Sequence, residues 1–133
     1  MSSERIPVLY DADCGFCRAS LALVLAWDRG RLLRPVALQS QAADELLRGM
    51  PADRQLASWH LAMPDGTVRS AGGAAAPLLR LLPGGAPLAE VTDRFPAAVE
   101  RAYGWVAAHR SALGRAIPSP ASRRAAAVIR SRH

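Results

Sequence analysis

The sequence predicts an α/β domain in which a four-stranded mixed sheet is flanked by helices, with extra helices at its C-terminal end. Three observations support this class. An apolar segment, an amphipathic helix and a second apolar segment fit within about 33 residues, which is the length of a β-α-β unit. A hairpin pattern follows at residues 56–71. Further helical patterns come after the hairpin.

Length and composition indicate one globular domain. The 133 residues are 50% apolar and 21% charged, as in ordinary folded domains. Two cysteines are too few for the disulfide framework of a small secreted protein. The first apolar run is too short for an export signal, and no run reaches the roughly 20 residues of a membrane span. We therefore expect a cytoplasmic protein without a membrane span.

The net charge of +6 comes from one end of the sequence. Residues 115–133 hold five arginines and no acid, so residues 1–114 are nearly neutral. We expect residues 1–114 to form the domain. Residues 115–133 are expected to form a basic flexible tail, with at most a weak helix at 124–130. A solvated tail is favoured over a nucleic-acid or lipid contact, so nucleic acid is not an expected partner.

The N-terminal half of the domain follows a strand–helix–strand pattern. Residues 6–10 are apolar almost throughout and predict a buried strand. Apolar positions at helical spacing predict a helix from Cys14 to Asp28, and Gly30 is placed to end it in the left-handed conformation. Residues 31–38 predict the second strand. Pro35 within that strand favours a sheet edge or a bulge.

The rest of the domain alternates turn signals with short periodic segments. Ser40 is placed to cap a helix that runs to about Arg48. Residues 56–63 predict a third strand, and a turn signal at 64–66 returns the chain along residues 67–71 as an antiparallel hairpin. Three helices are expected after it, over residues 72–82, 87–93 and 96–113.

Both cysteines lie where the first strand meets the first helix. This position and the order of elements are those of a thioredoxin-like domain. Two thiols at the Cys14-x-x-Cys17 spacing can close into a disulfide. Cys14 is nearer the helix N-terminus and solvent, where free N–H groups favour thiolate, so it is the expected nucleophile. Cys17, one turn further on, is expected to resolve the mixed disulfide, unless both cysteines are buried and inert.

Residues next to the two cysteines are expected to influence the reactivity of the pair. The charge of Asp13 opposes thiolate at Cys14, which favours a reductant or mild exchanger over a strong oxidant. Asp11 either shapes the turn, the favoured interpretation, or relays a proton to or from Cys17. Phe16 either contacts a partner or covers the sulfur. The remaining supporting residues are Tyr10 and Gly15.

The Asp11-x-x-Cys14-x-x-Cys17 pattern after a short strand resembles the DCC family of predicted thiol–disulfide oxidoreductases, also described as a domain of unknown function. The similarity extends from about Val8 to Gly114. It includes residues 38–40, 69–72 and 108–110. The resemblance implies a thioredoxin-like fold and redox activity of the cysteine pair. Two departures are Ala12, where the family often has glycine, and the absence of a proline directly before the third strand.

Other chemistries are less well supported by the sequence. One Cys-x-x-Cys provides two of the four ligands usual for structural zinc, and His60, His109 and His133 lie at no ligand spacing, so no metal is expected unless two chains pool their cysteines. Nothing matches a phosphate loop or a dinucleotide fingerprint, so no cofactor is expected. The expected partners are a protein or small thiol or disulfide substrate and a reducing thiol system. A non-catalytic thioredoxin-like module, docking a partner through helices 73–113 and the tail, stays open.

Overall fold

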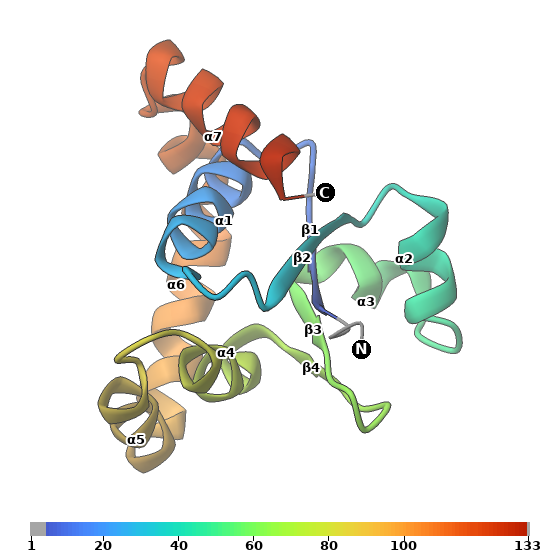
Figure 1. The fold of residues 1–133 in the computed structure, drawn as a ribbon, viewed down its shortest axis with the longest axis vertical. Helices are drawn as coiled ribbons and strands as arrows, with labels where there is room; N and C mark the ends of the chain where they lie inside the picture. Colours follow the sequence, from blue (N-terminus) through green and yellow to red (C-terminus); the bar gives the residue numbers. More distant parts are fainter. Residues whose placement is uncertain (1–4, 133) are drawn as a thin grey trace.

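The computed structural model describes residues 5–132 and has an α/β fold built on a four-stranded mixed sheet (Figure 1). Its order is β2-β1-β3-β4. The central strand β1 pairs parallel with β2 and antiparallel with β3, and β3 pairs antiparallel with β4. This is the predicted thioredoxin-like topology. The strands are β1 (Ile6–Tyr10), β2 (Leu33–Ala37), β3 (His60–Ala62) and β4 (Val68–Ser70).

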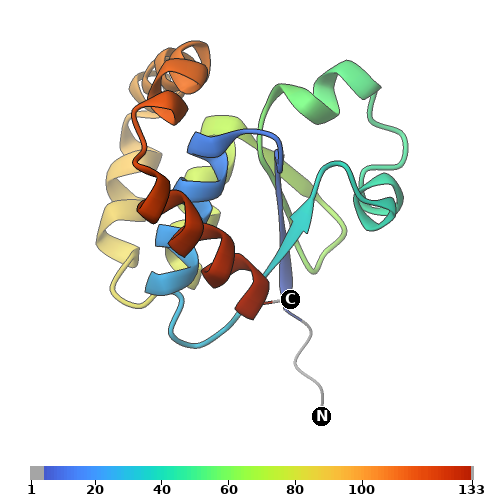
Figure 2. The same ribbon diagram turned by 90° about the horizontal axis from the view of Figure 1, so that it is seen from above.

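Helices cover both faces of the sheet. Figures 1 and 2 show α2 and α3 on one side of it and the remaining helices on the other. The helices are α1 (Gly15–Trp27), α2 (Gln41–Leu46), α3 (Ala52–Ala57), α4 (Ala75–Leu81), α5 (Ala86–Arg94), α6 (Pro96–Arg115) and α7 (Ser119–Ser131), with a 3-10 turn, η1 (Ala71–Ala74), before α4. The extra helices at the C-terminal end are therefore α5, α6 and α7.

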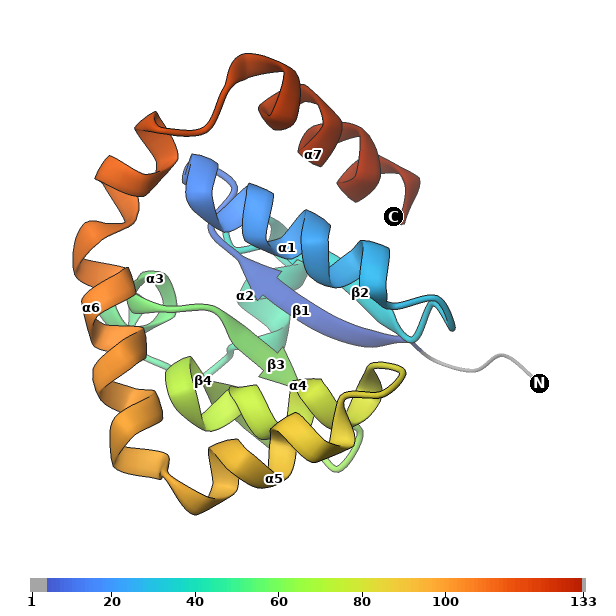
Figure 3. The ribbon, with the colours of Figure 1, turned by 90° about the vertical axis from the view of Figure 1, so that its left-hand side faces the viewer.

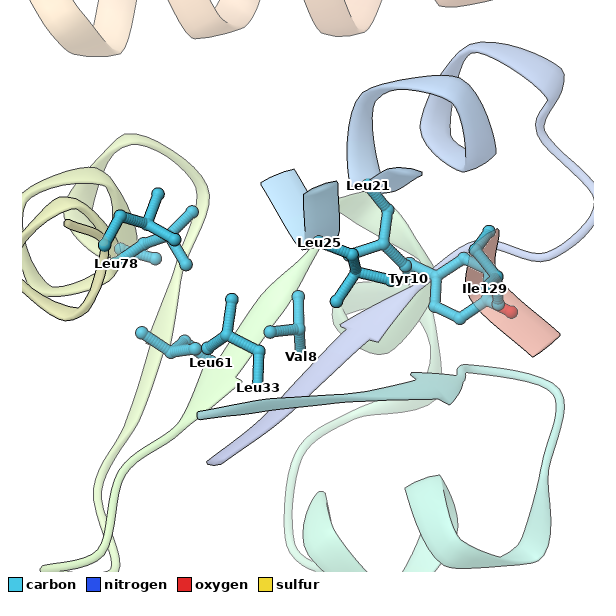
Figure 4. Packing of buried hydrophobic residues seen from close by; sticks show 10 residues of the cluster. Val8, Tyr10, Leu21, Leu25, Leu33, Leu61, Leu78 and Ile129 are labelled. Atoms are coloured by element: carbon cyan, nitrogen blue, oxygen red, sulfur yellow. The ribbon is translucent and has the colours of Figure 1, made fainter. Parts of the chain in front are cut away.

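Alternate side chains of β1 enter opposite halves of the core, as the strand period of two requires. Val8 and Tyr10 belong to the cluster under α1 and α4, part of which is drawn in Figure 4. Leu9 belongs to the cluster under α2. Because β1 is buried on both faces, its sequence is apolar throughout instead of alternating.

Helix α1 ends differently from the prediction. The left-handed residue after the helix is Arg31, with φ 54°, and not Gly30. The buried carboxylate of Asp28 accepts the backbone N–H groups of Leu32 at 3.1 Å and Leu33 at 2.9 Å. These hydrogen bonds fix the backbone where it turns from α1 into β2. The side chain of Asp28 therefore terminates the helix, a role that a C-terminal glycine often has.

Other local predictions are confirmed, and one is wrong. Pro35 lies in β2, which is an edge strand, and the Ser40 side chain caps α2 by accepting the Ala43 N–H. The third strand, however, covers only His60–Ala62, because Leu56 and Ala57 belong to helix α3 and the two residues after them connect it to the strand. Leu56 is 49% exposed, so it does not mark the buried face of a strand.

The predicted flexible tail is also wrong, because residues 119–131 form helix α7. Figure 3 shows α7 lying along α1, on the far side from β1. Ala125 and Ile129, four residues apart, are buried, and Ile129 joins the main core cluster. A single apolar stripe is enough to bind this arginine-rich helix to α1.

Candidate active site

Cys14 is the N-cap residue of α1. Its backbone is extended, and its N–H donates to the Asp11 carbonyl at 3.2 Å. Its Sγ accepts the backbone N–H of Cys17 at 3.3 Å, in the position that a serine or aspartate oxygen takes in an ordinary cap. The sulfur is partly exposed and lies at the positive end of the helix dipole.

Cys17 has a different environment, one turn further along α1. Burial, together with the hydrogen bond and the negative charge of Cys14, raises the pKa of the Cys17 thiol to about 12. The positive charge of Arg110 opposes this rise in pKa, and the negative charge of Asp11 adds to it. Cys17 is therefore a neutral thiol near pH 7. The two sulfurs of the pair are chemically unequal.

A hydrogen-bonded turn precedes the pair. Asp11 Oδ1 accepts the Asp13 N–H at 2.9 Å and the Gln39 side-chain amide at 2.8 Å. The Gln39 oxygen in turn accepts the Ala12 N–H at 3.1 Å. Asp11 thus shapes the turn, and its role as a proton relay stays a prediction. Gln39, which follows β2, fixes the turn from the neighbouring strand and was not identified from the sequence as a site residue.

The C-terminal part of α6 lies against the start of α1, where Gly114 and Gly15 face each other. A Cβ atom added to Gly114 would lie 3.2 Å from the Phe16 backbone nitrogen and 3.8 Å from the Gly15 Cα. One added to Gly15 would lie 3.9 Å from the Gly114 carbonyl oxygen. That distance is an ordinary contact, so Gly114 is the glycine whose missing side chain lets α6 pack beside the cysteine turn.

A cavity of about 310 Å³ lies beside Cys17. Its walls come from α1, β1, the segment before β3, α4 and α6. Most of its lining is apolar. The lining residues are Val8, Tyr10, Asp11, Phe16, Cys17, Ser20, Leu21, Val24, Ser58, Trp59, Leu78, Tyr103, Val106, Ala107 and Arg110.

Helix α6 provides the part of the cavity that sequence reasoning did not assign to the site. Tyr103, Val106, Ala107 and Arg110 recur at three- and four-residue intervals and so share one face of the helix. Tyr103 lies close to the Trp59 backbone and the Ser58 side chain, and burial raises its pKa. The periodicity could be read from the sequence, but not which partner this face packs against.

The family model for DCC1-like thiol-disulfide oxidoreductases matches residues 8–116. The chain belongs to this family. The match runs from β1 to the residue that follows α6, so it includes the cysteine pair and the cavity but not α7. No curated protein and no solved structure matches the chain.

In this member of the DCC1-like family, the predicted site residues divide between the cavity and the outer turn. Tyr10, Asp11, Phe16 and Cys17 line the cavity, and Tyr10 is also part of the core. Cys14 and Gly15 do not line it, and Asp13 is exposed at the surface of the turn. Of the two cysteines, only Cys17 lines the cavity, although both are partly exposed.

The described histidines are engaged away from the cysteines of this family member. His60 is buried in β3 between Ser70 and Gln55, and His109 stacks on Trp105 with ring centroids 4.2 Å apart. His133 lies outside the described residues. Within residues 5–132, no three His, Cys, Asp or Glu side chains are grouped so as to hold a metal ion. No helix of this same part of the chain is both long and apolar enough to span a membrane.

Proposed function

We propose that Cys14 and Cys17 form a reversible dithiol/disulfide couple, in which Cys14 attacks a substrate disulfide and Cys17 resolves the mixed disulfide. The observation that carries this proposal is the inequality of the two sulfurs. Cys14 Sγ accepts an N–H at the start of α1, whereas the pKa of the Cys17 thiol is raised by burial and by Cys14, so that Cys17 stays neutral. Membership of the DCC1-like thiol-disulfide oxidoreductase family supports the same chemistry.

The cycle proceeds by two thiol–disulfide exchanges. The Cys14 thiolate attacks one sulfur of the substrate disulfide, forms a mixed disulfide and releases the other sulfur as a thiolate. Cys17 then loses its proton and attacks Cys14 Sγ, which releases the second substrate thiol and closes the Cys14–Cys17 disulfide. The substrate gains two electrons from the pair and one proton from Cys17, and the second thiolate takes its proton from solvent. An external dithiol returns the pair to the reduced state.

The second exchange requires that Cys17 lose its proton. The thiolate released in the first exchange can accept it. Asp11 lines the same cavity as Cys17 and is the residue that we propose as a relay between the two, through the carboxylate oxygen not used by the turn. A compartment with reduced thiol pools, such as the cytoplasm, would keep the couple in the attacking dithiol form.

The test is a redox titration in defined glutathione buffers, with free thiols counted by alkylation and mass spectrometry. We expect two thiols to disappear together at one midpoint potential. If the two cysteines never form a reversible intramolecular disulfide, the proposal is wrong. Full biological activity of a Cys14→Ser variant would instead favour the non-catalytic module.

Two single variants separate the roles of the sulfurs. Cys17→Ser should retain the attack and accumulate a mixed disulfide at Cys14, because no resolving thiol is present. Cys14→Ser should accumulate none under the same conditions, because Cys17 stays a neutral thiol. Mixed disulfides with oxidised glutathione, measured by intact mass, distinguish the two. Equal trapping in both variants would contradict the assigned roles.

A further inference from the structure

We propose that the cavity beside Cys17 binds one half of a low-molecular-weight disulfide that carries an apolar, ring-sized group and a carboxylate. Arg110 binds the carboxylate, and the apolar walls hold the ring. This inference rests on the proposed function, since it names the substrate class for the same cysteine pair. It adds a site that the cysteine motif does not specify.

The size and the walls of the cavity define what fits inside it. Small-molecule pockets span roughly 300–1,000 Å³, so a volume of about 310 Å³ accommodates a small ligand and not a folded partner. Phe16, Trp59 and Tyr103 provide aromatic surfaces, and Val24 and Leu78 add aliphatic ones. Aromatic rings pack favourably against such surfaces through stacked or edge-on contacts. The walls therefore favour an apolar ring over a polar peptide segment.

The charge of the cavity indicates the second part of the ligand. Arg110 is half-buried in the lining and forms no ion pair within residues 5–132. The acid in the same lining, Asp11, accepts the Gln39 amide and the Asp13 N–H through one oxygen and forms no ion pair with Arg110. A guanidinium in an apolar setting is matched best by a carboxylate that accepts two parallel hydrogen bonds. Arg110 thus selects an anionic ligand.

The position of the cavity connects binding to the exchange reaction. Cys17 lines the cavity, and its N–H is hydrogen-bonded to Cys14 Sγ. A ring bound over Cys17 places the sulfur attached to it beside Cys14. Attack by Cys14 on that sulfur keeps this half bound and releases the other half as a thiolate. Attack by Cys17 on Cys14 then releases the bound half as a thiol.

The kinetic test compares two aromatic disulfides that differ in charge. Dithiobis(nitrobenzoate) carries a carboxylate on each ring, and dithiodipyridine carries none. The readout is the ratio of their second-order rate constants with the reduced protein, followed by absorbance of the released thiols. We expect Arg110→Gln to lower this ratio by about tenfold, which corresponds to one charge-assisted contact. An unchanged ratio would overturn the assignment of Arg110.

Arg101→Gln is the matched control, since Arg101 is an exposed arginine on the same helix and does not line the cavity. It removes the same net charge and should leave the ratio unchanged. An equal fall in both variants would mean that the ratio reports overall charge, and would overturn the proposal. A disulfide-linked peptide that reacts faster than both probes would also overturn it, in favour of a protein substrate.

A binding measurement separates this inference from the proposed function. Calorimetry with naphthoate and the Cys14→Ser/Cys17→Ser double variant tests the cavity without any exchange reaction. We expect binding, weakened at least tenfold by adding Arg110→Gln and abolished by adding Ala107→Phe, which fills the cavity. Binding by a protein whose wild type forms no reversible disulfide would refute the proposed function alone. A redox-active wild type whose double variant does not bind naphthoate would refute the cavity proposal alone.

Discussion

The Arg132 guanidinium donates to the backbone carbonyl of Asp28 at 3.0 Å and lies 4.0 Å from the Asp28 carboxylate, across 104 positions of sequence. Asp28 follows α1, the helix of the cysteine pair, and Arg132 follows α7. The Asp28 side chain is fully buried, and Arg132 is mostly so. The contact between Asp28 and Arg132 therefore links the end of α7 to the end of α1, the helix that begins at the cysteine pair.

Replacement of Asp28 should be among the most destabilising conservative changes in the chain. In Asp28→Asn, the amide can accept only one of the two N–H groups that the carboxylate accepts, and Arg132 loses its counter-charge. We expect a loss of about 3 kcal/mol in the free energy of unfolding, measured by urea denaturation. Glu45→Gln is the control, because Glu45 is exposed. A change at Asp28 no larger than that at Glu45 would contradict the structure.

Removal of the Ile129 side chain tests whether α7 belongs to the core. Ile129 is 4% exposed and packs in the cluster of Val8 and Tyr10, so Ile129→Ala should leave a cavity there. The expected cost is about 3 kcal/mol in the free energy of unfolding. Leu23→Ala removes similar apolar bulk where the side chain is 75% exposed, and should cost much less. Equal effects would indicate that α7 does not pack as described.

Acid should destabilise the protein through His60. Its Nε2–H donates to the Gln55 carbonyl at 2.9 Å, so Nδ1 accepts the Ser70 hydroxyl at 2.6 Å. Burial lowers the pKa of His60 below 6.5. Between that lowered value and 6.5 the unfolded chain binds more protons than the folded one, so the free energy of unfolding falls as the pH falls. Urea titrations at about pH 7.5 and 5.5 measure the loss.

The matched variant for this pH effect is His60→Gln. It should be less stable at neutral pH, yet lose less stability between the two pH values, because the titrating group is gone. His109→Gln changes an exposed histidine and should keep the wild-type pH dependence. An unchanged slope in His60→Gln would assign the effect to other groups.

Two glycines of α6 should respond differently to replacement by alanine. A Cβ at Gly104 meets nothing within 4 Å, so Gly104→Ala should stabilise the helix by about 0.5–1 kcal/mol. A Cβ at Gly114 would crowd the Phe16 nitrogen, so Gly114→Ala should gain less or become destabilising. Gly114→Ala should also shift the midpoint potential of the cysteine pair, whereas Gly104→Ala should not. Thermal unfolding and redox titration provide the two measurements.

Alkylation of the reduced protein should distinguish the two thiols. Iodoacetamide reacts with thiolate, and burial raises the pKa of Cys17 to about 12. Near neutral pH we therefore expect rapid labelling of Cys14 and little labelling of Cys17 until the protein is unfolded. Peptide mass spectrometry identifies the labelled residue. Equal rates at both cysteines would remove the basis for their assigned roles.

The sheet and the cysteine turn were predictable because their signals are local. An apolar strand, a turn and a helix with the cysteines at its start occur within about 33 residues, the length of a β-α-β unit. The end of α1 was not predictable at Gly30, since the turn is fixed by the side chain of Asp28. Residues 119–131 were misjudged because their arginines dominate the composition, whereas Ala125 and Ile129 decide the packing.

The cavity was beyond the reach of local patterns. Tyr103 and Arg110 are separated from Cys17 by more than 80 residues, and they meet it only because α6 packs beside α1. The helical spacing of these residues predicts a shared face, but many faces of this kind only pack against a core. Gln39 was similarly hidden, because its hydrogen bonds to the turn depend on the pairing of β1 with β2.

The contact between Asp28 and Arg132 also constrains the order of events during synthesis. Strand β1 and helix α1 leave the ribosome early, yet α1 keeps an uncovered apolar side until the chain has been made as far as residue 132. The hydrogen bond that the Arg5 side chain donates to the Arg132 carbonyl, at 2.6 Å, also forms only after residue 132 has been made. In the nascent chain, α1 is therefore packed on the sheet but not yet covered by α7. Folding of this protein is completed only after α7 has been translated.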